Sequence, residues 1–583
     1  MGLSDAGFTV LVGADNDPWA VETHTANVGG LGYTGDLTDP DDFLEHLAGW
    51  DVSSADVVVG GVPCQPFSRA GQSKIRDLVR NGSRSGDDPR AALWQSFMTV
   101  VGRLQPRAVI VENVPDLPAW DDGAVLIGFL ESFRALGYTV DARVLDSFAY
   151  GVPQHRARLF IVATRDCGEF EWPAPVGAPT TLREAIGDLP PIPGGQRAET
   201  LPYRPRGGRE LTWFQQQMRR DVPLASGTVI YDHITRAVRD DDMEAFTLLD
   251  EGQTYADLPE RLQRYRSDIF TDKYKRLAWD QLSRSITAHL AKDGYWYIHP
   301  EQHRTLSVRE AARIQSFPDW FRFAGQPSLR FRQIGNAVPP MVGEALGKRL
   351  LRAIEARPTV VGAQPDNARD TLLGWHRDHS RSYPWRDQGL PPWQVLMAEM
   401  CLHRTRADNV DGVFRALLRI APTPEDMVDN ADEALAAMRS LGLRWRAENV
   451  VRVAEELVEW FDGDVPDNDL DLRMLPGVGD YIAQAVLCFG FGRRAVLIDT
   501  NTVRIVSRMN GRDGTRRWQL RLDLHRMAGR PGPDAEFNYA LLDLGALVWR
   551  AGVPRCSECP LREHCVTGSG APAPTQLDLQ RAA

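Results

Sequence analysis

Four short apolar runs constrain the fold of the first half most strongly. TVLVGA, DVVVGG, RAVIVEN and LFIVAT, all within residues 9–164, are rich in β-branched residues and are separated by stretches with apolar residues at helical spacing. Such alternation is typical of an α/β fold with a largely parallel, Rossmann-like sheet. Between about residues 170 and 300 the pattern becomes irregular, with many prolines and charges, which indicates an inserted recognition region.

The second half has a different pattern. After ARPTVVGAQPDNA (356–368), whose prolines and small residues predict a linker, strand-like runs almost disappear and apolar residues recur at helical spacing, as in residues 429–461. We therefore expect an all-α second part. The predicted segments are an α/β part (1–168), a recognition region (169–300), a return to the α/β part (301–355), the linker, a helical part (369–548), a cysteine loop (549–567) and an unstructured tail (568–583).

Composition limits the cellular setting. A hydrophobic content of 43% with 25% charged residues is that of a folded protein, and 583 residues suit about two to four domains. The chain has no run of eighteen apolar residues and its first residues lack the features of a signal peptide, so we expect neither a membrane span nor secretion. Seven cysteines, four of them isolated, predict a reducing cytoplasm rather than a disulfide scaffold.

The net charge of −11 does not by itself favour a nucleic-acid partner. Binding depends on local patches, however, and arginine collects in residues 203–220 and 504–530. Taken alone, these stretches indicate two solvated faces.

Polar side chains follow or precede the strand runs. They are Cys64, Glu112, Gln154, Arg156 and Arg158. In an open α/β sheet, ligands bind where strands end. A cysteine at the end of a buried strand is usually a small core residue, but the two glycines and Pro63 before Cys64 favour a turn that presents a nucleophile.

Four blocks in this order, PCQxFS, ENV, QxRxR and RQIGNAVPP (332–340), resemble those of the DNA cytosine-C5 methyltransferases, over residues 1 to about 350. The resemblance implies that Cys64 adds to C6 of a flipped cytosine while Glu112 holds and protonates N3. Arg156 and Arg158 would stabilise the developing charge and order the site. Gln154 would contact DNA.

The resemblance also implies S-adenosylmethionine as cofactor. Its predicted contacts are Asp15, Asn16, Asp36, Pro63 and Asn336. Asp15 would hold the ribose hydroxyls, where the family more often has Glu, and Asp36 would face the adenine, although turn or N-cap roles remain open for both. The family's FxGxGG loop does not precede LSDAGFTVLVGADND. Either the start codon was assigned too late or the protein lacks part of its cofactor site.

A second group of motifs lies at 475–508. Gly477 and Gly479 in LPGVG predict a tight turn between two helices, whose backbone N–H groups can bind a phosphate. Alone, GVG is usually a helix connector and Asp499, twenty residues later, an N-cap. Together they resemble the helix-hairpin-helix DNA glycosylases, the superfamily of endonuclease III and the adenine-mismatch enzymes, from residue 383 to Cys565.

That resemblance implies roles for four further residues. Asp499 would stabilise the oxocarbenium-like sugar or activate a water. Strand-nicking members carry a lysine where this chain has Tyr481, which predicts a monofunctional glycosylase. Tyr481 with AEMCLHRT (398–405) is most like the thymine-releasing G·T mismatch enzymes, with Glu399 near the flipped base and Arg404 filling the gap in the duplex. The alternative is an amphipathic helix with exposed Glu and Arg.

The family binds a [4Fe–4S] cluster through C-x6-C-x2-C-x5-C. Cys556, Cys559 and Cys565 match the last three positions, and Trp549 stands at the first. Three thiolates with one non-cysteine ligand, or no cluster, are both open. A zinc site completed by His564 is less favoured, because adjacent residues rarely share one metal. We expect a cluster with an incomplete ligand set.

The two resemblances predict one bifunctional enzyme acting on double-stranded DNA. Deamination of 5-methylcytosine leaves thymine opposite guanine, so one chain would write the mark and repair its by-product, in a restriction-modification setting with a cognate endonuclease as possible partner. The alternatives are excision of 5-methylcytosine, excision of adenine, or DNA binding with an inactive methyltransferase half. Adenine excision is less favoured because only 18 residues follow Cys565.

Overall fold

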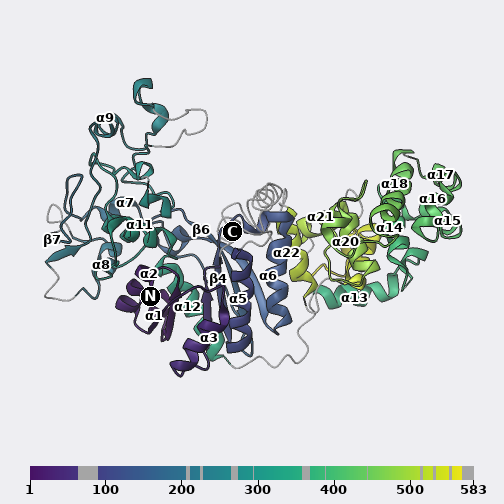
Figure 1. Ribbon diagram of the computed structural model, residues 1–583, viewed down its shortest axis with the longest axis horizontal. Helices are drawn as coiled ribbons and strands as arrows, with labels where there is room; N and C mark the ends of the chain where they lie inside the picture. Colours follow the sequence, from purple (N-terminus) through teal and green to yellow (C-terminus); the bar gives the residue numbers. More distant parts are fainter. Residues whose placement is uncertain are drawn as a thin grey trace. The chain divides into compact units, whose positions relative to one another are not determined.

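The computed structural model contains two compact units, Met1–Val360 and Val361–Asp578 (Figure 1). The division falls inside the predicted linker, of which residues 357–367 lie outside the described part, as does the predicted tail. The described residues are 1–62, 89–204, 210–222, 228–263, 274–292, 294–356, 368–387, 389–442, 444–511, 517–529, 534–549 and 555–566.

The strands of the α/β part form two sheets in the described residues. In the smaller sheet, β1 and β2 are parallel; in the larger, the order is β3–β4–β6–β5, with β3 parallel to β4 and with β6 antiparallel to both of its neighbours. The strands are β1 (Val12–Asp15), β2 (Leu31–Thr34), β3 (Val57–Gly60), β4 (Ala108–Asn113), β5 (Thr139–Asp146) and β6 (Ala157–Thr164).

Among the described strands of the larger sheet, only β6 departs from the predicted largely parallel arrangement, because β5, which is antiparallel to β6, runs in the same direction as β3 and β4. Only residues 147–156 connect β5 to β6, and so short a connection joins antiparallel neighbours. The strand runs at 9–14, 56–61, 107–113 and 159–164 correspond to β1, β3, β4 and β6, whereas the sequence analysis missed β2 and β5. The alternation of Val140 and Ala142 with polar residues was the available signal for β5.

Helices cover the larger sheet. From α12 (Pro340–Glu355), Leu346 and Leu350 pack against Ile110 of β4 and Phe160 of β6. Val111, whose side chain points to the opposite face from that of Ile110, is also fully buried, so both faces of β4 are covered. The other helices of this part are α1 (Gly2–Asp5), α2 (Pro18–Val28), α3 (Pro40–Gly49), α5 (Pro89–Leu104) and α6 (Ala124–Ala135).

The recognition region shares its core with the segment that follows it. One apolar cluster runs from Leu182 to Ile334 and includes α10 and α11, so the predicted boundary at residue 300 does not divide the packing. The chain then returns to the larger sheet through Val338 and α12. The elements here are α7 (Leu182–Ile186), β7 (Thr200–Pro202), α8 (Trp213–Arg219), β8 (Val229–Tyr231), α9 (Asp240–Leu248), α10 (Val308–Ile314) and α11 (Pro327–Asn336).

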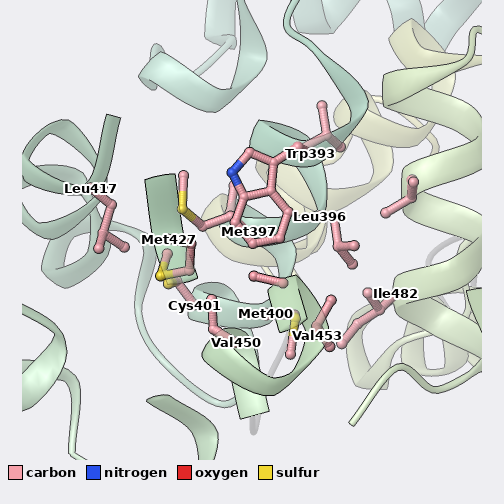
Figure 2. Packing of buried hydrophobic residues seen from close by; sticks show 14 of the residues in the cluster. Trp393, Leu396, Met397, Met400, Cys401, Leu417, Met427, Val450, Val453 and Ile482 are labelled. Carbon is pink, nitrogen blue, oxygen red and sulfur yellow. The ribbon is translucent and has the colours of Figure 1, made fainter. Parts of the chain in front are cut away.

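The second unit is helical throughout its described residues, as predicted. Figure 2 shows its main core, in which Trp393, Leu396 and Met400 of α14 meet Val453 of α18 and Ile482 of α20. Its helices are α13 (Ala368–His379), α14 (Pro392–Leu402), α15 (Ala407–Ile420), α16 (Pro424–Asp429), α17 (Ala431–Met438), α18 (Arg444–Trp460), α19 (Asp469–Leu472), α20 (Asp480–Ala485), α21 (Thr500–Met509), α22 (Arg517–Ala528) and α23 (Ala535–Leu547). Among the helices described in either unit, none is long and apolar enough to cross a membrane.

Candidate active sites

Polar groups meet at the edge of the larger sheet where β3 and β4 end. Because these strands are parallel, their carboxyl ends lie at the same edge, and antiparallel β6 begins there. Asn113, buried at the end of β4, donates a 3.0 Å hydrogen bond from Nδ2 to the carbonyl oxygen of Val62. Pro63 and Cys64, which come next, lie outside the described residues. Asn113 thus holds the backbone at Val62, two residues before the predicted nucleophile.

The predicted acid and one predicted arginine are brought together. Arg158 Nε lies 3.0 Å from Glu112 Oε1, and both side chains are mostly buried. Burial raises the pKa of the Glu112 carboxyl, while Arg158 and Arg156 act in the opposite direction. The carboxyl of Glu112 is therefore mostly buried and paired with the Arg158 guanidinium near the end of β4.

Gln154 and Arg156 are supports rather than exposed groups. The amide of Gln154 is fully buried and bonds the carbonyl of Ile314, the side chain of Gln315 and the N–H of Ile286. The side chain of Gln154 is therefore not exposed in this structure, whereas the sequence analysis predicts that it contacts DNA. Arg156, 1% exposed, donates to the carbonyl oxygens of Gly335 and Ala337 at 2.9 and 3.0 Å, and burial lowers its pKa to about 9. Arg156 thereby holds the backbone of residues 335–337.

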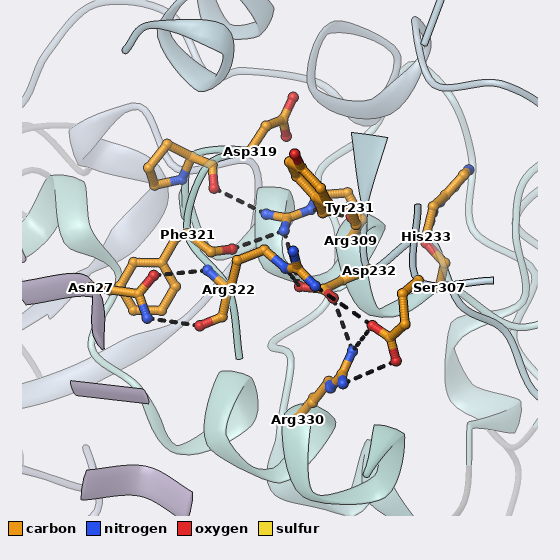
Figure 3. Close-up of polar contacts among 12 residues, drawn as sticks. Asn27, Tyr231, Asp232, His233, Ser307, Arg309, Asp319, Phe321, Arg322 and Arg330 are labelled. Carbon is orange, nitrogen blue, oxygen red and sulfur yellow. Dashed lines mark hydrogen bonds and ion pairs between the residues drawn. The ribbon is translucent and has the colours of Figure 1, made fainter. Parts of the chain in front are cut away.

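A buried carboxylate links the recognition region to the segment after it (Figure 3). Asp232, fully buried after β8, accepts a 2.9 Å bond from Arg330 and contacts Arg309 and Arg322 at 3.3 Å each. The backbone N–H of Arg322 donates to Asn27 of α2 at 2.8 Å. A single carboxylate therefore joins three parts of the first unit, which the sequence analysis did not find.

In the second unit, Glu399, Tyr481 and Asp499 converge from three elements. Glu399 is buried in α14; burial raises its pKa to about 7, opposed by Arg386 and by a hydrogen bond from Tyr481 of α20. Asp499 precedes α21 and accepts backbone N–H bonds from Asn501 and Thr502 at 3.0 and 2.7 Å. The N-cap role is therefore real, and it holds the carboxylate in place near Glu399.

The sequence analysis did not identify Arg386, Asp543 or Tyr539 as part of this group. Arg386 is held by Asp543, which is fully buried and accepts from both of its terminal nitrogens at 2.8 and 2.9 Å. The Arg386 guanidinium lies over the ring of Tyr539, 4.5 Å from its centroid, and Tyr539 stacks on Phe489 at 4.1 Å. Among the described residues, neither Arg386 Nε nor Glu399 Oε2 has a hydrogen-bond partner. Buried polar atoms without a partner are rare in folded proteins.

The two hairpin glycines differ in backbone geometry, and Arg404 is exposed. Gly477 has φ +78°, and a Cβ there would lie 2.8 Å from Asn449 Nδ2. Gly479 is the N-cap of α20 with φ −91° and open space around it. Arg404 is exposed, with φ +58°, at the turn after α14.

The cysteine loop does not reproduce a metal site. Among the described residues, which include Cys556, Cys559 and Cys565, no three His, Cys, Asp or Glu side chains are grouped so that they could hold a metal ion. Trp549 Nε1 lies 3.1 Å from Cys559 Sγ. The residues present do not fit the four-thiolate cluster that the glycosylase resemblance implies.

Comparison with known proteins establishes the family to which the first part of the chain, residues 1–352, belongs. Residues 1–352 match the family described as C-5 cytosine-specific DNA methylase. The chain belongs to this family. It is 33% identical over 328 residues to the type II methyltransferase M.Bpa9945I of Bacillus paralicheniformis, covering 51% of this chain and 70% of the relative. It is 31% identical over 425 residues to M.AgeI of Thalassovita gelatinovora, covering 60% and 96%.

For the second unit, a thermostable thymine-DNA glycosylase structure aligns at 27% identity over 34% of this chain and 94% of that chain. Its TM-score is 0.32, which establishes no shared fold.

Membership of the methylase family implies S-adenosylmethionine as methyl donor. Asp15 and Asn16 lie exposed at the end of β1, and Asp36 is exposed two residues after parallel β2, so all three lie at one strand edge. Asp36 also accepts the N–H of Thr38 at 2.9 Å, the predicted turn role, and this bond lowers its pKa. Exposed carboxylates at a strand edge suit the hydroxyl groups of this cofactor.

The closing block of the methylase part meets the cofactor side through residues other than the predicted one. Asn336 is exposed at the end of α11. Arg332 instead pairs with Asp17 at 3.0 Å, and Gln333 accepts a 2.6 Å bond from Thr23 of α2. Asp17 before Pro18 is a helix-start signal, but no local pattern identifies Arg332 as its partner.

Proposed function

We propose that this chain methylates cytosine at C5 in a specific DNA sequence and also excises thymine from the G·T mismatch that deamination of its product creates. The observation that carries the second activity is the convergence of Glu399, Tyr481 and Asp499 in the helical unit. The first activity follows the family of residues 1–352. Both would act on double-stranded DNA.

For methyl transfer, we assign Cys64 as the nucleophile toward C6 and Glu112 as the acid at N3. Two contacts support this assignment. Arg158 lies beside Glu112 at 3.0 Å, and Asn113 holds the carbonyl two residues before Cys64. The raised pKa of Glu112 favours a carboxyl that can protonate N3. The bound cofactor supplies the methyl group, and its ribose would meet Asp15.

For base excision, the glycosidic bond breaks and the sugar gains positive charge. The Asp499 carboxylate, oriented by its two N–H bonds, would stabilise that charge or take a proton from water. Glu399, with a pKa of about 7, would be partly protonated at neutral pH and able to donate to a thymine oxygen. With Tyr481 where nicking members have lysine, no Schiff base would form there. We therefore propose a monofunctional glycosylase that leaves an abasic site.

The two activities complement each other chemically. Methylation at C5 turns a repairable deamination product, uracil, into thymine, a normal base of DNA. A glycosylase carried by the methylating chain would be concentrated at the sites where this mismatch arises. The relatives are type II methyltransferases, which favours a restriction-modification setting with a cognate endonuclease.

End-labelled duplexes test the excision activity. Full-length protein is incubated with duplexes bearing G·T, G·U, G·5-methylcytosine, or adenine opposite oxidised guanine, and each product is split with and without hot alkali. Alkali-dependent cleavage at G·T, lost in Asp499→Asn, is the expected result. Cleavage at 5-methylcytosine or at adenine, and not at G·T, would show that this base and not thymine is the substrate. No cleavage of any duplex would indicate that the second unit only binds DNA.

Methyl transfer is tested separately. Labelled S-adenosylmethionine and unmethylated genomic DNA are incubated with the wild type and with Cys64→Ser. The expected result is label in 5-methylcytosine for the wild type only. An inactive wild type that does not retain S-adenosylmethionine would indicate an incomplete cofactor site and would overturn this half of the proposal.

A further inference from the structure

The side chain at the first position of the cysteine pattern is built into the apolar core. Trp549 follows α23 and is 3% exposed. It belongs to the cluster that includes Leu544, Leu561 and Cys565, and Arg508 lies over its ring with the guanidinium 5.8 Å from the centroid. A residue this buried and this large is a structural part of the loop and not a vacant ligand position.

The sulfur atoms have contacts of their own. Cys559 Sγ accepts a hydrogen bond from Trp549 Nε1 at 3.1 Å, and Cys565 Sγ donates to the carbonyl oxygen of Arg508 at 3.6 Å. These contacts place both sulfur atoms against groups of the protein itself, an indole N–H and a backbone carbonyl.

The side chains are also not grouped as metal ligands. In the described residues, 555–566 included, no three potential ligands are grouped around a common position. Cys565 and Leu561 are buried in the core, whereas Cys556 is only partly buried. The loop has the organisation of a small apolar cap.

We infer that this loop holds no iron–sulfur cluster and that Trp549 stabilises the loop in place of a cluster. The indole packs the end of α23 against Leu561 and Cys565 and fixes Cys559 through its N–H. The cysteines remain as thiols. This inference does not depend on the proposed excision activity, since it concerns how the second unit folds.

Iron analysis of the full chain tests it directly. Protein is purified without oxygen, and its iron, acid-labile sulfide and visible absorption are measured before and after reconstitution with iron and sulfide. The expected result is no stoichiometric iron in either sample. Stoichiometric iron and sulfide with the visible absorption of a cluster would overturn the inference.

Substitutions at Trp549 test its role. Trp549→Cys completes the four-cysteine pattern and is expected to bind iron on reconstitution, while Trp549→Phe, which keeps a ring but not the N–H, is expected to bind none. If Trp549→Cys also stays free of iron, Trp549 is not the residue that replaced the ligand, and the assignment fails.

Thermal unfolding of the second unit provides a readout without metal. Trp549→Ala is expected to lower its Tm by about 10 °C, as for loss of a buried aromatic side chain. Cys559→Ala is expected to lower it by about 3 °C or less. The reverse order, with the cysteine variant the more damaging, would indicate a metal-bearing loop and contradict the inference.

Discussion

The side-chain amide of Asn113 donates a 3.0 Å hydrogen bond to the carbonyl oxygen of Val62, and this contact ties the end of β4 to the end of β3. Both groups are buried. The backbone that leads into Pro63 and Cys64 is thereby fixed by a residue 51 positions later in the chain. We expect the reactivity of the PCQ block to depend on this bond.

Asn113→Ala is expected to lower the rate of methyl transfer by a factor of about ten to a hundred, because the nucleophile's segment loses its anchor. The unpaired carbonyl also costs about 1–3 kcal/mol of stability. Tyr138→Phe is the matched control, since it leaves the carbonyl of Pro106 without its 2.7 Å bond to Tyr138. Equal methylation rates in the two variants would contradict the anchoring role.

Arg158→Gln is expected to move the pH profile of methyl transfer. Arg158 lowers the pKa of Glu112 against the dominant effect of burial, so its removal raises that pKa further. If protonated Glu112 is the acid, activity is lost as pH rises through this pKa, and the alkaline limb shifts to higher pH in the variant. Rates measured from pH 5 to 9 check this, with Arg165→Gln, at the other end of β6, as control. An unmoved alkaline limb would remove Glu112 as the titrating group.

Glu399→Gln is expected to stabilise the second unit above neutral pH. Because the folded pKa of about 7 lies above the ordinary value of 4.5, the wild type has its full stability below pH 4.5 and loses about 3 kcal/mol as pH rises through 7. Glutamine stays neutral throughout. The Tm values of the two proteins should therefore coincide near pH 4.5 and separate by pH 8, with the variant higher.

Thermal unfolding scans from pH 4.5 to 8 check this stability prediction. Glu448→Gln is the control, because Glu448 is half-exposed and paired with Arg444 on the surface of α18. A pH dependence of Tm that Glu399→Gln leaves unchanged would show that the buried carboxyl is not the source.

Gly477 and Gly479 should respond differently to alanine. At Gly477, the positive φ and the 2.8 Å approach of Asn449 predict strain of about 1–3 kcal/mol and weaker DNA binding. At Gly479, φ is −91° and the space is open, so Gly479→Ala should fold normally. Thermal unfolding and DNA titrations of both variants check the pair. Equal tolerance at the two positions would mean that the turn is not held as described.

The sequence by itself determined the parts of this protein that depend on neighbouring residues. The alternation of apolar runs predicted β1, β3, β4 and β6, and helical spacing predicted the all-α second half. The ordered blocks around Glu112 and Arg158 indicated the methylase family, which the match over residues 1–352 established. These features are local in the chain, so periodicity and spacing carry them.

Tertiary structure alone decided which polar residues are exposed and which are supports. Gln154 and Arg156 are buried because residues 283–337 fold over them, and no local pattern encodes that contact. Likewise, the guanidinium of Arg386, which lies near the Glu399 group, is held by Asp543, 157 residues later in the chain. The antiparallel β6 and the shared core of α10 and α11 arise in the same way. Burial of a charge depends on partners far away in the chain, and those are set by the fold.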